Sequence, residues 1–430
     1  MDILILGGNG FIGSAVMARL AAAGHRVAGL GRNIEGASRR HPEFRFIRAD
    51  LSAMRTPSDW AQLVDEHQAI VNCAGALQDG LRDDLDAVQQ RAMAALYEAA
   101  AKTGGRRLIV QISARTEGSG ADLPFLSTKR NADAALKASG VDHVILRPAM
   151  VVGRNAHGGT ALIRALAGFP LVVPTIHDRS LVETVALDDV AEAVLRAVEG
   201  QIKPGSDVPL AAPEALTLGD VLARHRRWLG LPPARLVPVP LALARPVTIL
   251  ADLAGRLGWR SPLRSTAMAV MAGGVVARDQ GADDPGFELR TLDRTLTENP
   301  SGVQDAWFAR LYLLKAPVLV MLSAFWLASG LIPLAKLAAA MAHFDGLLTY
   351  HPALFTVLAT CLLDIGLGLA VLFRPTARRA LWGMIAVSLV YLLAATVTNL
   401  SLWFDPLGPL VKVLPSIMLT LVALATLDER

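Results

Sequence analysis

Residues 316 to 335 carry no charged side chain. As a helix, a stretch of this length spans about 30 Å, the thickness of the hydrocarbon layer of a bilayer. Three more apolar stretches follow, at about 354–373, 380–402 and 407–427. The alternative, a helical bundle in water, would have to bury four almost entirely apolar helices, so the pattern predicts four membrane-spanning helices.

The charges beside these stretches predict an orientation. Arg310 and Lys315 precede the first stretch, and Arg374, Arg378 and Arg379 lie between the second and the third. The connection between the third and fourth stretches has no lysine or arginine. By the positive-inside rule, we expect a multi-pass protein of the cytoplasmic (inner) membrane with both termini in the cytoplasm.

The rest of the chain has the composition of a globular domain. Over all 430 residues the mean hydropathy is +0.40, with 53% hydrophobic and 19% charged residues. The apolar excess lies beyond about Leu311, and the start of the chain shows neither a basic region nor a cleavage site, so we expect the first domain to stay cytosolic. A net charge of +4 without a basic tract argues against nucleic-acid binding. Two distant cysteines and isolated histidines predict no metal site.

The segment GGNGFIG, residues 7–13, follows a short apolar run and precedes a helical pattern. Glycine at 7 permits a tight turn, glycine at 10 lets the backbone approach a pyrophosphate, and glycine at 13 lets helix and strand pack closely. The helix N-terminus then offers N–H groups and a positive dipole end to the anion. The alternative is a glycine-rich turn without a ligand.

Strand and helix patterns alternate up to about residue 146. This alternation predicts an α/β Rossmann-type doubly wound parallel sheet, followed by an all-α four-helix transmembrane domain. The expected strands are 3–6, 25–31, 44–49, 69–73, 107–113 and 142–146, and the expected helices are 14–23, 84–102 and 127–138.

Arg32 follows the second expected strand, where enzymes that prefer NAD usually carry an acid. An arginine at that place suits a 2′-phosphate, whose charge an acid would repel. The sequence therefore favours NADP(H), with NAD(H) as the alternative because Glu35 lies close by. A solvated surface arginine is the other reading of Arg32.

Five segments occur in an order that is typical of one family: GGNGFIG, ADL (49–51), NCAG (72–75), LRPAMVVG (146–153) and VALDDVAEAV (185–194). Together they resemble the short-chain dehydrogenase/reductase superfamily. Its atypical branch, which includes the NADPH-holding accessory subunit of respiratory complex I, is the most similar. The resemblance covers roughly residues 1 to 300.

The resemblance implies a cofactor site. Asp50 and Leu51 would lie beside the adenine, and Ala74 and Gly75 beside the cofactor ribose. Lys129 would bind the nicotinamide ribose, and Arg147 with Pro148 would close the strand edge near the nicotinamide. The full set of cofactor-binding candidates is Gly7, Asn9, Gly10, Phe11, Ile12, Gly13, Arg32, Asp50, Leu51, Ala74, Gly75, Lys129, Arg147 and Pro148.

The resemblance also implies catalytic residues, and there the chain departs from the family. Ser113 and Lys129 stand where the family has its serine and lysine, but Phe125 occupies the position of the proton-donating tyrosine. Either another group, such as water or Lys129, gives the proton, or the cofactor is bound without turnover. A third reading is that the alignment is accidental and another tyrosine, such as Tyr97, serves.

The four apolar stretches, ending KVLPSIMLTLVALATLDER, resemble the DoxX-like membrane family, which is linked to redox and quinone-related membrane proteins. This resemblance supplies no catalytic residue. Asp364 lies within the second stretch, and an ionisable group at such a depth is costly. It either lines a polar pocket for a headgroup or proton, near Tyr391, Ser388 and Lys412, or is a hydrogen-bonded structural residue.

The sequence thus predicts three regions: 1–235, a nucleotide-binding domain with a substrate lobe from about 154; 236–308, a linker or cap; and 309–430, the transmembrane domain. Residues 241–257 are amphipathic and suit either a membrane surface or an ordinary solvated face. We expect an oxidoreductase tethered to the bilayer that acts on a hydrophobic membrane-resident substrate, a quinone, isoprenoid or lipid carbonyl. The rival is a catalytically silent NADP(H)-bound scaffold or redox sensor of a membrane protein complex.

Overall fold

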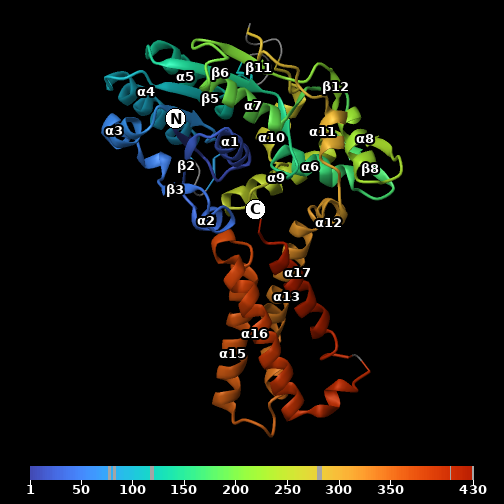
Figure 1. The fold of residues 1–430 in the computed structure, drawn as a ribbon. Coiled ribbons are helices and arrows are strands. Elements are labelled where there is room, and N and C mark those ends of the chain that lie inside the picture. The colour runs from blue at the N-terminus through green and yellow to red at the C-terminus, as the bar shows by residue number, and fades with distance from the viewer. Residues whose placement is uncertain (76–78, 81–83, 117–120, 278–282, 407, 429–430) are drawn as a thin grey trace. The chain divides into compact units, whose positions relative to one another are not determined.

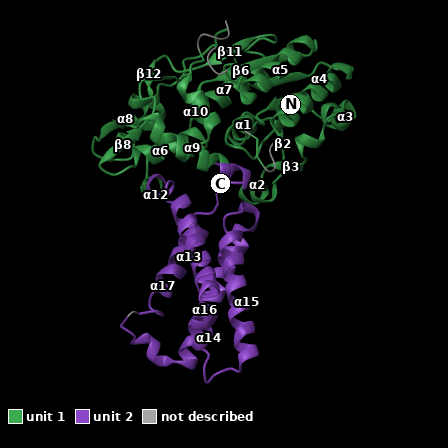
Figure 2. Cartoon of the chain, turned by 180° about the vertical axis from the view of Figure 1, so that it is seen from behind, with its two compact units in different colours: residues 1–252, 261–306 green, residues 253–260, 307–430 purple. Residues whose placement is uncertain are grey.

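The computed structural model describes residues 1–75, 79–80, 84–116, 121–277, 283–406 and 408–428 (Figure 1). The chain forms two compact units (Figure 2). Unit 1 comprises Met1–Asp252 and Ser261–Ala306, and unit 2 comprises Leu253–Arg260 and Trp307–Arg430.

Unit 1 is built on a seven-stranded sheet in which every neighbouring pair is parallel. The strand order is β11-β6-β5-β4-β1-β2-β3, so the chain reverses direction across the sheet between β1 and β4. In such sheets ligands bind beyond the carboxyl ends of the strands at this reversal. The strands are β1 (Asp2–Leu6), β2 (Arg26–Gly31), β3 (Arg45–Arg48), β4 (Ala69–Asn72), β5 (Leu108–Ile112), β6 (Asp142–Pro148) and β11 (Asp207–Leu210).

Helices cover both faces of this sheet, because its strands are apolar on both sides (Figure 1). In β1, Ile3 and Ile5 belong to one core, while Leu4 and Leu6 belong to the other. The first core contains α1 (Phe11–Ala22) and α7 (Leu187–Val198), and the second contains α3 (Pro57–Glu66), α4 (Ala92–Lys102) and α5 (Pro124–Ala138). The predicted doubly wound parallel sheet is therefore confirmed.

Element boundaries differ from the expected ones in two informative places. The helix expected over 84–102 begins as a π-helix, Asp86–Arg91, and becomes α-helical at Ala92. Helix α5 starts at Pro124 rather than at residue 127, because proline suits the first turn of a helix. As a result, Phe125 lies inside the helix that also carries Lys129.

The remainder of unit 1 is a lobe of two-stranded pairs and helices. The parallel pairs are β7 (Met150–Val152) with β10 (Thr184–Ala186) and β8 (Val172–Thr175) with β13 (Arg235–Pro238). Strands β9 (Leu181–Val182) and β12 (Leu216–Thr217) are antiparallel. The helices of the lobe are α6 (Gly159–Ala167), α8 (Leu218–Trp228), α9 (Leu241–Arg256), α10 (Ser265–Ala272), α11 (Leu292–Glu298) and α12 (Val303–Leu311), the last of which runs into unit 2. Two short elements, α2 (Glu35–Arg40) and the 3-10 turn η1 (Leu51–Ala53), belong to the connections of the seven-stranded sheet.

Unit 2 is a helical bundle. Three of its helices are long and apolar enough to cross a membrane, among the residues that the structure describes: α13 (Lys315–Ala335), α15 (Tyr350–Ala370) and α16 (Arg374–Thr398). Of the 18 most apolar consecutive residues of each helix, at most 28% are buried within the protein. Their large outward side chains therefore suit lipid better than water. Shorter helices are α14 (Leu337–Ala342) and α17 (Val413–Ala425).

The fourth predicted span, 407–427, is wrong as a continuous helix. Helix α17 has only 13 residues. At 1.5 Å per residue it extends about 20 Å, less than the thickness of the hydrocarbon layer. Pro406, Gly408 and Pro409 precede it, and proline cannot continue the hydrogen bonding of a helix interior.

The glycine loop packs closely because several of its residues lack a side chain. A Cβ at Gly13 would overlap the carbonyl oxygen of Gly7, and one at Gly8 would lie 2.7 Å from the Cα of Gly29. Gly7 itself adopts a φ of +70°, in the left-handed region. Close packing of the loop against α1 and β2 thus depends on the missing side chains.

Gly13→Ala should therefore destabilise unit 1 by about 1–3 kcal/mol, because backbone atoms must shift to admit the methyl group. The measurement is thermal unfolding of the full chain in detergent micelles. Gly104→Ala is the matched control, since nothing lies within 4 Å of a Cβ there. It should change stability by less than about 0.5 kcal/mol; equal effects of the two variants would contradict the packing argument.

Candidate cofactor and active site

The glycine loop lies between the carboxyl end of β1 and the start of α1, as predicted. Gly10 is the N-cap residue of α1, and its N–H donates to the carbonyl oxygen of Gly7 at 2.8 Å. The first turn of α1 contains no acidic residue. A loop with glycines at 7, 8 and 10, at the positive end of a 12-residue helix, fits the pyrophosphate of a dinucleotide.

The segment after β2 brings several predicted residues to the same edge of the sheet. The Asn9 amide donates to the carbonyl oxygen of Asn33 at 2.9 Å, which ties the glycine loop to the residue beside Arg32. Glu35 forms an ion pair with Arg48 at 3.2 Å. Glu35, the residue that kept NAD(H) as an alternative cofactor, is thus paired with a neighbouring arginine.

Asp50 caps the 3-10 turn η1. Its Oδ1 accepts hydrogen bonds from the N–H of Ser52 at 3.0 Å and the hydroxyl of Ser52 at 2.8 Å. Leu51 is buried in the core. These contacts fix the loop that the resemblance places beside the adenine, and the adenine contact itself stays a prediction.

A cavity of about 320 Å³ opens beyond the carboxyl ends of β4, β5 and β6. It brings together seven residues singled out from the sequence: Ile12, Ala74, Gly75, Ser113, Phe125, Lys129 and Pro148. The other lining residues were not foreseen and are mostly apolar: Cys73, Ile112, Ala114, Arg115, Leu126, Ala149, Val270, Gly274, Val275 and Val276. Four of them come from α10 and the segment after it, more than 120 residues further along the chain than Ala149, so no local pattern points to them.

Phe125 and Lys129 lie one helical turn apart on α5, so both side chains reach the cavity. The Lys129 ammonium nitrogen is 5.7 Å from the centre of the Phe125 ring and donates to the carbonyl oxygen of Ile112 at 2.9 Å. Burial lowers the pKa of Lys129, although the nearby Asp133 carboxylate opposes this shift. No tyrosine is among the described residues that line the cavity.

Ser113 lies at the end of β5, and its hydroxyl donates to Oδ2 of Asp133 at 2.6 Å. Asp133 is 3% exposed, and its Oδ1 is buried without a hydrogen-bond partner. Burial raises the pKa of Asp133, against the opposing effects of Arg147, Ser113 and Lys129. Asp133 was missed from the sequence, although it follows Lys129 by one further turn on the same face of α5.

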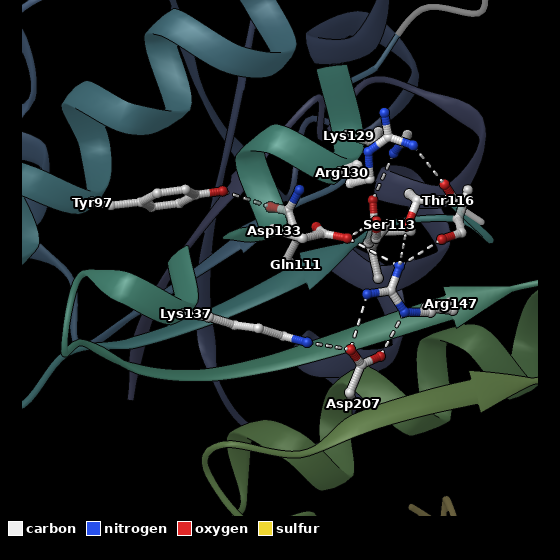
Figure 3. Close-up of polar contacts among 12 residues, drawn as sticks. Tyr97, Gln111, Ser113, Thr116, Lys129, Arg130, Asp133, Lys137, Arg147 and Asp207 are labelled. Carbon is white, nitrogen blue, oxygen red and sulfur yellow. Dashed lines mark hydrogen bonds and ion pairs between the residues drawn. The ribbon is translucent and has the colours of Figure 1, made fainter. Parts of the chain in front are cut away.

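Arg147 holds this cluster together (Figure 3). Its guanidinium makes two hydrogen bonds with Asp207, at 2.6 and 2.9 Å, and approaches Oδ2 of Asp133 at 3.0 Å. It also donates to the carbonyl oxygen of Ala114 at 2.7 Å. Burial would raise the pKa of Asp207, but the hydrogen bonds from Arg147 and Lys137 outweigh this and lower it. Arg147 therefore holds Asp133, the hydrogen-bond acceptor of Ser113, while Pro148 lines the cavity.

Tyr97 is buried elsewhere in the same unit. Its hydroxyl donates to Gln111 at 3.2 Å, and Gln111 also accepts from the amide of Asn72 at 2.9 Å (Figure 3 shows the first of these bonds). Because Tyr97 does not line the cavity, the structure does not bring it into the place of the missing tyrosine. Burial raises the pKa of Cys73, which does line the cavity, to about 12, so its thiol stays neutral.

Asp364 of α15 is buried in unit 2 and bonded to two other helices. Its carboxylate accepts hydrogen bonds from the hydroxyl of Ser329 on α13 at 2.7 Å and from that of Tyr391 on α16 at 2.9 Å. Of the neighbours expected from the sequence, Tyr391 makes the contact and Ser388 is buried separately. The arrangement suits a carboxylate that joins three helices.

Arg147→Met should remove the shared partner of buried Asp133 and half-buried Asp207 and destabilise unit 1 by about 3–5 kcal/mol at neutral pH. Without the arginine, the pKa values of Asp133 and Asp207 rise, so the loss should shrink as the pH falls and both carboxylates take up protons. Thermal unfolding at pH 7.5 and 5.5 measures this.

Lys137→Met is the control for this experiment. Lys137 pairs with the same Asp207 at 2.8 Å, but its side chain is 49% exposed. Its removal should cost less than about 1 kcal/mol at either pH. A loss at Arg147 that does not depend on pH would contradict the electrostatic account.

Two family models match separate parts of the chain. Residues 7–200 match the NAD(P)H-binding family, and residues 323–421 match the DoxX-like family.

Among the described residues, no group of three histidine, cysteine, aspartate or glutamate side chains could hold a metal ion.

Curated relatives match part of the chain. An uncharacterized protein of Mycobacterium tuberculosis is 26% identical over 253 residues, which are 59% of this chain but only 26% of that protein. The ceramide reductase of Caulobacter vibrioides is 25% identical over 191 residues, 44% of this chain and 58% of the reductase. The chain thus matches about a quarter of the length of the mycobacterial relative.

Solved structures also resemble part of the chain. MoeE5 in complex with UDP-glucose and NAD has a TM-score of 0.49 at 19% identity, covering 73% of this chain and 100% of that one. UDP-glucuronic acid 4-epimerase from Bacillus cereus has a TM-score of 0.47 at 19% identity, covering 56% and 86%. The chain thus has a Rossmann-type N-terminal unit that resembles the NAD(P)H-binding family and a helical unit that resembles the DoxX-like family.

Proposed function

We propose that this protein is a membrane-tethered oxidoreductase that uses NADP(H) to reduce a hydrophobic, membrane-resident substrate, a quinone, isoprenoid or lipid carbonyl. One observation carries the proposal. The cavity places Ser113 and Lys129 beside Ala74 and Gly75, and most of its remaining wall is apolar. An apolar wall with few polar groups is typical of a site for a hydrophobic ligand.

The membrane part supports the choice of substrate. A soluble reductase gains little from three long apolar helices unless its substrate or partner is in the bilayer. The named activity of the Caulobacter relative, ceramide reductase, concerns a lipid and points to the same class. We place both termini in the cytoplasm, on the charge pattern around Arg310, Lys315 and Arg374.

The residues fit the cofactor. The glycine loop and the N-terminus of α1 would hold the pyrophosphate, Arg32 the 2′-phosphate, and Lys129 the ribose of the nicotinamide, since its ammonium group lies 3.9 Å from the position of a Cβ on Gly75. When bound, the nicotinamide supplies a hydride. Phe125 has no proton to give, so the proton must come from another protein group or from water.

Lys129 is the residue best placed to give that proton. Its ammonium group lines the cavity, and burial lowers its pKa, which makes it a stronger acid than an exposed lysine. Ser113 directs its hydrogen toward Asp133 and offers its lone pairs to the cavity. With Asp133 ionised, Ser113 can accept a hydrogen bond from a substrate hydroxyl. With Asp133 protonated, the carboxyl group donates to Ser113, and the serine hydroxyl can then donate to a substrate carbonyl.

The second candidate function is a catalytically silent NADP(H)-bound scaffold or redox sensor of a membrane complex. Phe125 favours it, because the usual acid is missing while the binding residues remain. The glycine loop and Lys129 are equally consistent with both functions, since both require a bound cofactor.

One experiment separates the two. The full-length protein in lipid discs made from extracted host lipids receives NADPH deuterated at both C4 positions, and mass spectrometry follows deuterium in the lipid fraction. Labelled lipid would establish the reductase and identify its substrate. A quinone can lose the label to solvent, so NADPH consumption is followed in the same sample. NADPH that binds but is neither consumed nor passes on its label would establish the scaffold or sensor.

Arg32→Ala should weaken NADPH binding about tenfold, or about 1.4 kcal/mol, and leave NADH binding nearly unchanged. The reason is that only NADPH carries the 2′-phosphate that the guanidinium would bind. Titration of cofactor fluorescence measures both affinities. Arg39→Ala, at an exposed arginine of α2, is the control and should change neither affinity. An equal loss for both cofactors would refute the NADP(H) preference.

Phe125→Tyr should increase deuterium transfer to lipid at least about tenfold if the substrate is a carbonyl compound, because general acid catalysis typically contributes a hundredfold or more. The new hydroxyl would lie near the Lys129 ammonium group, which is 5.7 Å from the ring centre. Phe125→Leu removes the ring without adding an acid and serves as the control. No gain with NADPH still bound would argue against carbonyl reduction.

A further inference from the structure

Helix α9 has its large and small side chains in unusual places. The side chains that face the rest of the protein are small: Ala244, Thr248, Ala251 and Gly255, which recur at intervals of three or four residues and are half-buried or buried. The large apolar side chains point outward, with exposed fractions of 68% for Leu243, 66% for Ile249 and 65% for Leu250. A helix on a water-soluble domain normally shows the reverse pattern.

The exposed side chains form a continuous face. Leu243, Val247 and Leu250 follow one another at i, i+4 and i+7 and so lie in one row. Leu253, also exposed, lies beside that row. A contiguous exposed apolar surface of this kind is typical of a site that a membrane or another protein covers.

Charges border the apolar face on one side. Arg245 and Arg256 are both exposed and lie three turns apart on the same side of α9. The single acid of the helix, Asp252, is engaged elsewhere, since its Oδ1 accepts from Arg264 at 3.2 Å and from the N–H of Ser265 at 3.3 Å. The outer surface of α9 therefore combines an apolar face with positive charge only.

The C-terminal end of α9 is part of the membrane unit. Residues 253–260 belong to unit 2, where the carbonyl oxygen of Leu257 accepts from the N–H of Arg374 at 3.0 Å. The Trp259 indole donates to the carbonyl oxygen of Leu372 at 2.6 Å. The Arg374 guanidinium and the Lys315 ammonium group lie 5.4 and 5.7 Å from the Trp259 ring centre.

These contacts locate the end of α9 relative to the spans. Arg374 and Lys315 begin α16 and α13, and Leu372 follows α15, so all three belong to the same end of the bundle. Tryptophan, lysine and arginine together at the end of apolar helices are typical of the headgroup level of a bilayer. Helix α9 thus ends where the hydrocarbon layer is expected to begin.

We propose that α9 is an interfacial helix that lies in the headgroup layer of an anionic bilayer. Leu243, Val247 and Leu250 enter the upper part of the acyl chains, and Arg245 with Arg256 binds anionic headgroups. The continuity of α9 with the spans and its exclusively basic border select lipid over a second copy of the chain or another protein as the occupant.

The position of α9 matters for the cavity, a step that rests on the proposed function. The contacts of Asp252 with Arg264 and Ser265 join α9 to the start of α10. Val270 of α10 and Val275 after it line the cavity. A helix in the headgroup layer is thus connected, over about 20 residues, to the wall of the site that would receive a membrane-resident substrate.

The test measures lipid contact and needs no turnover. Single cysteines replace Leu243, Val247 and Leu250 in the full chain with Cys73→Ser and Cys361→Ser, and carry an environment-sensitive fluorophore. The protein is placed, one chain per disc, in lipid discs of phosphatidylglycerol with a lipid spin-labelled near the top of its acyl chain. A label at Leu363, exposed on α15, is the positive control, and one at Gln62, exposed on α3, is the negative control.

We expect quenching at all three α9 positions to reach at least half of that at Leu363, with almost none at Gln62. Quenching at the level of Gln62 would overturn the proposal. A blue-shifted emission that appears only in discs with two chains would also overturn it, since a second copy would then cover the face. Failure of NADPH turnover would leave this result unaffected, so the two proposals can fail separately.

The proposed binding of anionic headgroups by the two arginines is tested with the double variant Arg245→Glu/Arg256→Glu. The native helix should be quenched at least twofold more in phosphatidylglycerol than in phosphatidylcholine discs, and the double variant should lose this difference. Arg39→Glu, on exposed α2, is the matched control and should keep it. Equal quenching of the native helix in both lipids would show that anionic headgroups are not bound.

Discussion

The buried arginine at the end of β6 is the interaction on which the candidate site depends. Arg147 joins Asp207 of β11 to Asp133 of α5, and Asp133 in turn accepts the hydrogen of Ser113 at the end of β5. Two strands and a helix are thereby held at fixed positions by one planar cation that satisfies two carboxylates. Such an arrangement is stable only when it is complete, because Asp133 and Arg147 are too deeply buried for either charge to stand alone. The orientation of the serine is a consequence of this charge balance.

Sequence patterns predicted those parts of the site that are local. The glycine loop was foreseen because its spacing, its preceding strand and its following helix lie within about 20 residues. Phe125 and Lys129 were foreseen because their spacing of four residues resembles that of the family's tyrosine and lysine, and the parallel sheet because strand and helix patterns alternate along the chain. Asp133 could have been foreseen from the same periodicity, since it extends the Phe125–Lys129 spacing by one turn.

Other parts depend on tertiary pairing and had no local signal. Asp207 reaches Arg147 across 60 residues, and Val270 and Val275 reach the cavity from a lobe whose packing no motif encodes. The short α17 has a different cause. Hydropathy depends on side chains only, so it does not show where the backbone can become helical. Pro406 and Pro409 restrict the backbone, and the helix starts only at Val413.

The absence of the tyrosine changes the chemistry of the site more than its shape. Phe125 keeps the aromatic ring against the Lys129 side chain, so the wall of the cavity is preserved and only the acid is lost. A lysine that assists a neighbouring phenol needs its charge, but a lysine that is itself the acid benefits from a lowered pKa, which burial provides. Substrates whose reduced form is already acidic, such as hydroquinones, require the least from such a donor. Under the proposed function, the residues that remain would suit a quinone-like acceptor better than a simple ketone.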